Sequence, residues 1–315
     1  MDEQFEPRSL LALDTLRTLQ QRSDVPSALR LLAQLAILLG SAAAVGSHSG
    51  QPLVEWAAAM LLALAWATIF APFHEATHQT AFRSRRANAL AAWLTGIPFG
   101  LAPAVYRTFH FEHHRHTHDP QRDPEIAPDP RTAMWPSTRR GWLLAALGYK
   151  LMLLKGRLTL EFVRRPPAQW AALGAWTAHI DDPATLAREC RILAALWLLF
   201  LVSALTWLPG GGWLLLALWF GQVLQTLWLM CEHTGLPHSG SILRRTRSVL
   251  SNACVRWWLW NMNYHAEHHA WPSIPWHHLP AAHAAINTHL EACAPGYVAL
   301  HRSVLAGAPL ATPAP

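Results

Sequence analysis

Four long apolar segments constrain the fold of this 315-residue chain more than any other feature. Each is nearly free of charge and approaches the roughly 20 residues with which a helix crosses a bilayer. The segments are Leu31–Gly46, Leu53–Phe73, Ile192–Leu208 and Trp213–Cys231. The whole chain is 52% hydrophobic and only 14% charged, with a positive mean hydropathy. We therefore predict an all-α integral membrane protein with four transmembrane helices.

The positions of the basic residues orient these segments. Two short turns, Ser47–Pro52 and Pro209–Gly212, join the segments into two hairpins, and neither turn contains Lys or Arg. Because Lys and Arg accumulate on the cytoplasmic side of membrane proteins, we predict that both termini and the long central loop are cytoplasmic. These parts would form a helical cap on that side. The N-terminal sequence MDEQFEPRSL is acidic and polar, which predicts no cleavable signal peptide.

Three histidine clusters lie beside the apolar segments, on the predicted cytoplasmic side. They read His74-Glu-Ala-Thr-His78, His110-Phe-Glu-His113-His114 and His265-Ala-Glu-His268-His269. On a helix, these spacings place the imidazoles of a cluster on one face. A ninth histidine, His233, follows the fourth apolar segment. This number exceeds the four ligands of a structural zinc site and suits two ions with four or five nitrogens each. Imidazole binds iron, zinc, copper and nickel, so the ligand type leaves the metal open.

This organisation predicts one membrane domain over residues 31–300, between a cytoplasmic N-terminal segment (1–30) and a disordered C-terminal tail (301–315). Ala87–Val105 is uncharged but interrupted by glycine and proline. If it crossed the bilayer, the first two histidine clusters would lie on opposite faces, so we interpret it as re-entrant or interfacial. Gly141–Leu154, flanked by basic residues, predicts an amphipathic helix on the cytoplasmic surface.

Acidic residues within or beside the clusters are candidates for a supporting role. A carboxylate often accepts a hydrogen bond from the second nitrogen of a metal-binding imidazole and so fixes its tautomer. The candidates are Glu75, Glu112, Glu232 and Glu267. A solvated helix carboxylate is the alternative interpretation for some of them. His116 and His118, which extend the second cluster, are predicted to face the loop without binding metal.

The order H-x-x-x-H, H-x-x-H-H, H-x-x-H-H around two hairpins resembles the membrane-bound fatty acid desaturase and hydroxylase superfamily. The resemblance covers most of the chain, roughly residues 50–290. The strings that carry it are FHEATHQTAFRS, YRTFHFEHHRHTHDPQRDPE, EHTGLP and NMNYHAEHHAWPSIPWHHLP. The last string is similar to the third box of bacterial desaturases. The box begins with His265, where front-end desaturases have Gln, which argues against that branch.

The resemblance implies a non-haem centre of two iron ions at the cytoplasmic face of a bacterial inner membrane. With O2 as co-substrate, it would attack an unactivated C–H bond of a fatty-acyl chain in a membrane lipid. The implied iron ligands are His74, His78, His110, His113, His114, His265, His268 and His269, with His233 as an additional ligand. No catalytic residue is implied beyond the metal ligands. The chain carries no fused cytochrome b5 module, so a separate electron donor such as a ferredoxin or rubredoxin is implied.

Two other functions are compatible with parts of this pattern. A hydroxylase or related oxygenase of a lipid, carotenoid, alkane or small amphiphile could use the same scaffold. A metal transporter would need ionisable residues inside the spans, and Ile192–Leu208 and Trp213–Cys231 contain no carboxylate or histidine. The formal net charge of +6 does not indicate nucleic-acid binding, because the basic residues form no dense run and lie beside apolar segments.

Overall fold

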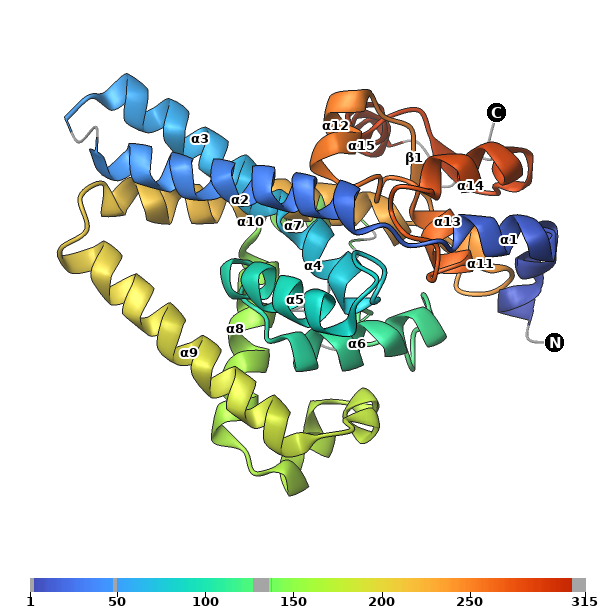
Figure 1. Cartoon of the computed structure of the whole chain (residues 1–315), viewed down its shortest axis with the longest axis horizontal. Helices are drawn as coiled ribbons and strands as arrows, with labels where there is room; N and C mark the ends of the chain where they lie inside the picture. Colours follow the sequence, from blue (N-terminus) through green and yellow to red (C-terminus); the bar gives the residue numbers. More distant parts are fainter. Residues whose placement is uncertain (1–2, 48–49, 127–135, 137, 308–315) are drawn as a thin grey trace.

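The computed structural model describes residues 3–47, 50–126, 136 and 138–307. Apart from one pair of two-residue strands, the regular structure of these residues is helical (Figure 1). The elements of the first half are η1 (Glu3–Leu10), α1 (Leu13–Leu19), α2 (Asp24–Ser47), α3 (Pro52–Thr68), α4 (Phe70–Thr77), α5 (Arg85–Phe99), α6 (Pro103–Arg115), α7 (Arg139–Ala146), α8 (Tyr149–Arg164), η2 (Pro167–Leu173) and η3 (Ala175–His179). Those of the second half are α9 (Pro183–Thr206), α10 (Gly211–His233), α11 (Ile242–Arg245), β1 (Ser248–Val249), α12 (Ala253–Trp258), α13 (His265–Ala270), α14 (Leu279–Ile286), η4 (Asn287–His289), β2 (Cys293–Ala294) and α15 (Tyr297–Ala306).

Four helices of the described chain are long and apolar enough to cross a membrane, which confirms that part of the prediction. They are α2, the continuous pair α3–α4, α9 and α10. α2 and α9 begin earlier than the apolar segments, because polar residues form their first turns. α9 starts with Pro183 at its first position, and the Asp182 side chain accepts a hydrogen bond of 3.0 Å from the Thr185 N–H. Both are favourable helix starts, and hydropathy alone does not detect them.

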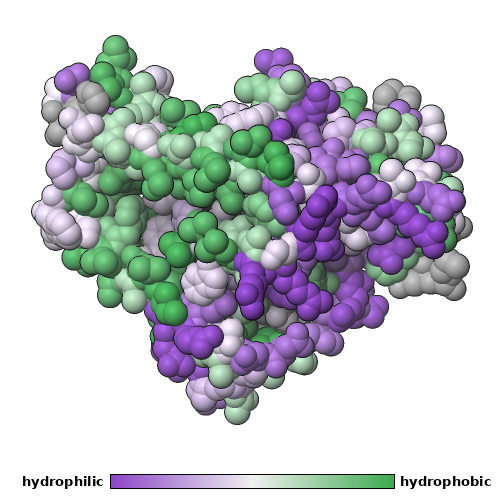
Figure 2. All heavy atoms as spheres, viewed as in Figure 1, coloured by the Kyte–Doolittle hydropathy of each residue, from purple (hydrophilic) through white to green (hydrophobic). Residues whose placement is uncertain are grey.

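These helices form an apolar half of the molecule. α3 packs against both α2 and α10, whereas α9 diverges from this layer and α8 contacts both α9 and α10 (Figure 1). Much of the outer surface here is apolar, as Figure 2 shows, and Leu39, Leu53, Leu198 and Leu205 are all more than 60% exposed. Leucines exposed in such number on one half of a protein are expected where lipid, and not water, covers the surface.

The stretch Ala87–Val105 is a bent helix pair. α5 ends at Phe99 and is followed by Gly100, which has a left-handed backbone (φ 88°), and α6 runs at 93° to α5. The bend returns the chain, so that the C-terminal ends of α4 and α6 meet. A bent pair of this kind is either a broken span or a re-entrant segment, so the re-entrant or interfacial segment stays a prediction.

The prediction of one continuous amphipathic helix over Gly141–Leu154 is wrong. The chain forms two helices there, α7 and α8, which are separated at Gly148 (φ 74°). A side chain at Gly148 would lie 2.7 Å from the backbone of Gln222 and Val223 in α10. The break therefore coincides with a close approach of two backbones, which the amphipathic pattern does not report.

The remaining elements form a second, smaller core beside the ends of α4 and α10. Tyr264, Trp271 and Ile274 around α13 pack with Leu11 and Leu19 of the N-terminal segment. That segment also contacts the histidine region, where the Gln4 side chain donates a hydrogen bond of 3.3 Å to the carbonyl of His114. At the other end, residues 301–306 belong to α15, and the predicted disorder of 308–315 falls outside the described residues.

Candidate metal centre

Nine histidines come together in two adjacent groups. The five-histidine group consists of His74, His78, His110, His114 and His268, and the four-histidine group consists of His113, His233, His265 and His269. Within each group, one ring nitrogen from every residue lies within 4.8 Å of the others. All nine histidines singled out in the sequence are thus brought together, and they come from α4, α6, α10 and α13, with His78 directly after α4.

The H-x-x-H-H spacing distributes each box over both groups. On α6, His110 and His114 belong to the five-histidine group and His113 to the other. On α13 the assignment is reversed, since His265 and His269 join the four-histidine group and His268 the five-histidine group. Residues four apart share a helix face, whereas the intervening histidine points about 60–100° away. Two such helices can therefore bridge two neighbouring metal ions.

Hydrogen bonding between the rings does not account for the five-histidine group. The Nε2 atom of His110 lies 2.8 Å from that of His74, 2.9 Å from that of His78 and 3.0 Å from that of His114. A single ring nitrogen offers either one N–H or one lone pair, so it cannot satisfy three such contacts. Two nitrogens bound at about 2.1 Å to one ion, at right angles, are about 3.0 Å apart. The spacing fits ring nitrogens that could hold one metal ion between them.

The four-histidine group has the same character. The Nε2 atom of His265 lies 3.1 Å from those of both His233 and His269. In this group burial holds the pKa of His265 and His269 well below the ordinary value. Burial also acts to lower the pKa of His113, but the nearby carboxylates of Asp123 and Glu125 raise it to about 9. Of the nine histidines, all except the half-buried His78 are at most 8% exposed. Neutral imidazoles with inward lone pairs are the form in which histidine binds metal.

Three of these rings are oriented through their outer nitrogen. The Nδ1–H of His113 donates to both oxygens of Asp123, at 2.9 and 3.0 Å. That of His233 donates to the carbonyl of Arg245 at 3.0 Å, and that of His269 donates to the hydroxyl oxygen of Thr117 at 3.1 Å. A proton held on Nδ1 leaves the lone pair on Nε2, which faces the group.

The four predicted carboxylates differ in position. Glu75 lies 3.9 Å from Nδ1 of His74 and accepts a hydrogen bond of 2.7 Å from Thr80. Glu232 lies 3.4 Å from Nε2 of His265, the nitrogen that faces the group. These two are therefore close enough to influence candidate ligands.

Glu112 and Glu267 do not contact any of the nine histidines within the described chain. Glu112 pairs with Arg115 and lies 3.7 Å from His116. Glu267 pairs with Ser248 and His283. Each glutamate stands two residues after the first histidine of its box, which turns it to the far side of the helix by about 200°.

The segment after α6 contains the partners that sequence reasoning missed. Thr117 and Asp123 hold two of the rings, and Glu125 lies 3.9 Å from Nδ1 of His110. Their closeness in sequence to the second box could have indicated a role at the site. The segment is irregular, however, so helical spacing cannot predict which way their side chains point. His118, in the same segment, belongs to neither group. Its ring lies 4.3 Å from that of His238 at a tilt of 32°, and its Nδ1–H donates to the carbonyl of Pro237 at 2.9 Å. His116 also lies outside both groups.

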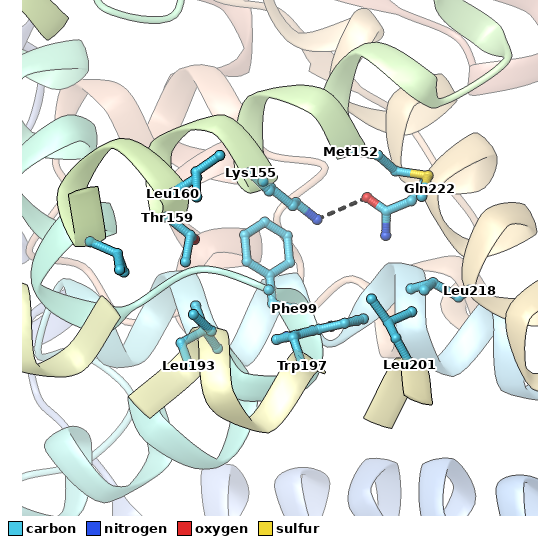
Figure 3. A pocket seen from close by; sticks show the side chains of 14 residues that line it. Phe99, Met152, Lys155, Thr159, Leu160, Leu193, Trp197, Leu201, Leu218 and Gln222 are labelled. Carbon is cyan, nitrogen blue, oxygen red and sulfur yellow. Dashed lines mark hydrogen bonds between the residues drawn. The ribbon is translucent and has the colours of Figure 1, made fainter. Parts of the chain in front are cut away.

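An aromatic layer separates the five-histidine group from an apolar cavity. The ring of Phe70 lies 5.8 Å from that of His74, and the ring of Tyr106 stacks on His110 at 4.9 Å. Phe99 packs on Phe70 at 5.0 Å and also lines a cavity of about 340 Å³ between α8, α9 and α10 (Figure 3). A second cavity, of about 260 Å³, includes Trp228, whose ring lies 5.5 Å from Phe70 on α4.

A family model described as fatty acid desaturase matches residues 51–303. This match includes all nine histidines and most of the chain. No curated protein matches the sequence. The donor set fits the di-iron centre for which the family is known, because nine imidazole nitrogens in two adjacent groups suit two iron ions. The chain therefore belongs to the fatty acid desaturase family and is an oxidoreductase of the desaturase and hydroxylase type.

Proposed function

We propose that this member of the fatty acid desaturase family is an oxygen- and iron-dependent membrane desaturase that introduces a double bond into a fatty-acyl chain. The pair of buried histidine groups is the observation that supports this function best. Apolar cavities that reach the adjoining aromatic layer supply a place for an aliphatic substrate.

Each histidine group would hold one iron ion. The five-histidine group offers one ligand more than the four-histidine group, and Glu232 stands near the latter at His265. When bound, the two irons supply the oxidising power, drawn from O2, that removes hydrogen from an unactivated methylene. Asp123 and Thr117 would keep the rings of His113 and His269 in the tautomer that binds metal.

The residues around the centre would position the chain and exclude water. Phe70 and Tyr106 pack directly against histidines of the five-histidine group. A methylene held against these rings would lie in an apolar and water-excluded site, where a strong oxidant attacks the bound carbon and not the solvent. The position of that carbon, and therefore the product, depends on the depth to which the chain enters.

The membrane arrangement is part of the proposal. α2 with α3–α4 and α9 with α10 would cross the bilayer as two hairpins, with the histidine groups and both termini on the cytoplasmic side of a bacterial inner membrane. The lack of Lys and Arg in 47–52 and 209–212 supports this orientation. A separate donor, such as a ferredoxin or rubredoxin, would deliver electrons from the cytoplasm.

Mass spectrometry of the lipids of an expressing host tests the function. The wild-type protein is compared with His268→Ala and His269→Ala, which remove one candidate ligand from each group. We expect a lipid species that lacks two hydrogens in the wild type alone, with reduced bound iron and normal membrane insertion in both variants. His278→Ala, outside both groups, is the matched control and should retain activity.

Each other outcome is informative. A wild-type species that gains one oxygen would replace desaturation by hydroxylation on the same scaffold. Full activity in both His268→Ala and His269→Ala would overturn the proposed centre. If the iron-loaded wild type leaves all lipids unchanged even with a ferredoxin and its reductase supplied, the substrate is not a membrane lipid of that host.

A further inference from the structure

Lys155 occupies a position on α8 where the sequence pattern calls for an apolar residue. The buried face of α8 consists of Leu151, Lys155, Leu158 and Phe162, which recur at helical spacing. Lys155 is only 6% exposed. A lysine near a membrane surface usually extends its ammonium toward water, whereas this one turns into the protein.

The Lys155 ammonium is surrounded by neutral groups. It donates hydrogen bonds of 3.0 Å to the side-chain oxygens of both Gln222 and Gln225, and it lies 3.6 Å above the ring of Phe99. None of the described carboxylates lies within ion-pairing distance of it. Burial lowers the pKa of this ammonium well below its ordinary value. A buried cation without a counter-ion destabilises the folded protein, and an anion bound beside it would reduce this cost.

The ammonium faces the 340 Å³ cavity between α8, α9 and α10. Figure 3 shows Lys155 and Gln222 at one side and Leu193, Trp197 and Leu201 of α9 on the opposite wall. The lining is otherwise almost wholly apolar. The volume falls in the range of about 300–1,000 Å³ that is common for small-ligand sites. A long apolar wall with one cation matches an aliphatic chain that carries one anionic group.

We propose that this cavity binds a free fatty acid, with its carboxylate on the Lys155 ammonium and its alkyl chain along α9. A charge-assisted hydrogen bond would give the buried cation the counter-ion that it lacks. The inference rests on the proposed function for the role of this ligand as substrate, since Phe99 joins the cavity wall to the aromatic layer beside the histidines. Binding itself requires no iron and no turnover.

Photo-cross-linking with a diazirine-bearing palmitic acid tests the site on the purified full chain. Unlabelled palmitic acid and methyl palmitate, which share one chain and differ in charge, serve as competitors. We expect cross-links in α8 and α9, and a preference for the acid of about tenfold or more, the factor that corresponds to one charge-assisted hydrogen bond. In Lys155→Met the two competitors should become equal, while Lys150→Met on the same helix keeps the preference.

A second variant keeps the test decisive if Lys155→Met fails to fold. A Cβ added at Gly156 meets no atom within 4 Å, and this residue lines the cavity. Gly156→Leu should therefore fill the cavity and abolish cross-linking while Lys155 remains. Equal competition by acid and ester in the wild type, or cross-linking unchanged in Gly156→Leu, would overturn the proposal. Because the assay uses no turnover, a failure of the desaturase function would leave its result intact.

Discussion

At the scale of the residue, we expect Asp123 to affect the iron affinity of one histidine group specifically. Its two oxygens hold the Nδ1–H of His113, a member of the four-histidine group. Asp123→Asn removes the charge and keeps the shape. We expect the affinity of this group for iron to fall about ten- to a hundredfold, as is typical when such a partner is lost. Iron titration with elemental analysis of the purified protein would measure this fall.

The matched control is Asp119→Asn in the same segment. Asp119 hydrogen-bonds with the backbone of Gln121 and Arg122 and with the Arg122 side chain, and it contacts none of the nine histidines. It should leave iron affinity unchanged. Equal iron affinity in wild type and Asp123→Asn would show that Asp123 only shapes the loop, where it also accepts a hydrogen bond from the backbone N–H of His118.

At the scale of the element, the junction of α7 and α8 predicts a strong local effect. Gly148 has a left-handed backbone and lies where an added Cβ would be 2.7 Å from the backbone of Gln222. Gly148→Ala should push α8 away from α10 and lower the thermal stability of the protein in detergent. The backbone conformation alone costs about 1–2 kcal/mol for a residue with a side chain.

Gly156→Ala is the control for this prediction, because it lies in the same helix with open space around its Cβ. Alanine is favoured over glycine there by about 1 kcal/mol, so the unfolding temperature should stay the same or rise. If both variants unfold at the same temperature as the wild type, the contact between α8 and α10 does not support the fold.

The sequence predicts the helices, and the residues that share a helix face, better than it predicts contacts between segments that are distant in the chain. Hydropathy predicted the four long helices, and the box spacing predicted eight of the nine histidines that the structure gathers. The ninth, His233, was predicted from its position after the fourth apolar segment. Helical periodicity also places Glu112 on the side of α6 opposite to His110, which agrees with its position in the structure. Asp123 could not be placed, since an irregular segment has no fixed periodicity. The break at Gly148 depends on the backbone of α10, which lies about seventy residues further along the chain.

At the scale of the whole molecule, the apolar and polar halves predict how the protein lies in a membrane. The apolar surface covers α2, α3, α9 and α10, whereas the polar surface covers the region of α11, α13 and the N-terminal segment (Figure 2). The histidine groups lie at the ends of α4 and α10. The orientation of the protein in the membrane therefore decides from which side an electron donor can approach the histidine groups.

Cysteine labelling in intact cells tests this orientation. Cys254, the exposed native cysteine, is first replaced by Ser, since Cys190, Cys231 and Cys293 are buried. Gly212→Cys, where a Cβ meets open space, should then react with a membrane-impermeant maleimide in intact cells. Arg86→Cys, exposed after the first histidine box, should react only after lysis. The reverse pattern would place the histidine groups outside the cytoplasm and exclude a cytoplasmic ferredoxin or rubredoxin as donor. Labelling of both before lysis would show that the segments between them do not cross the membrane as two hairpins.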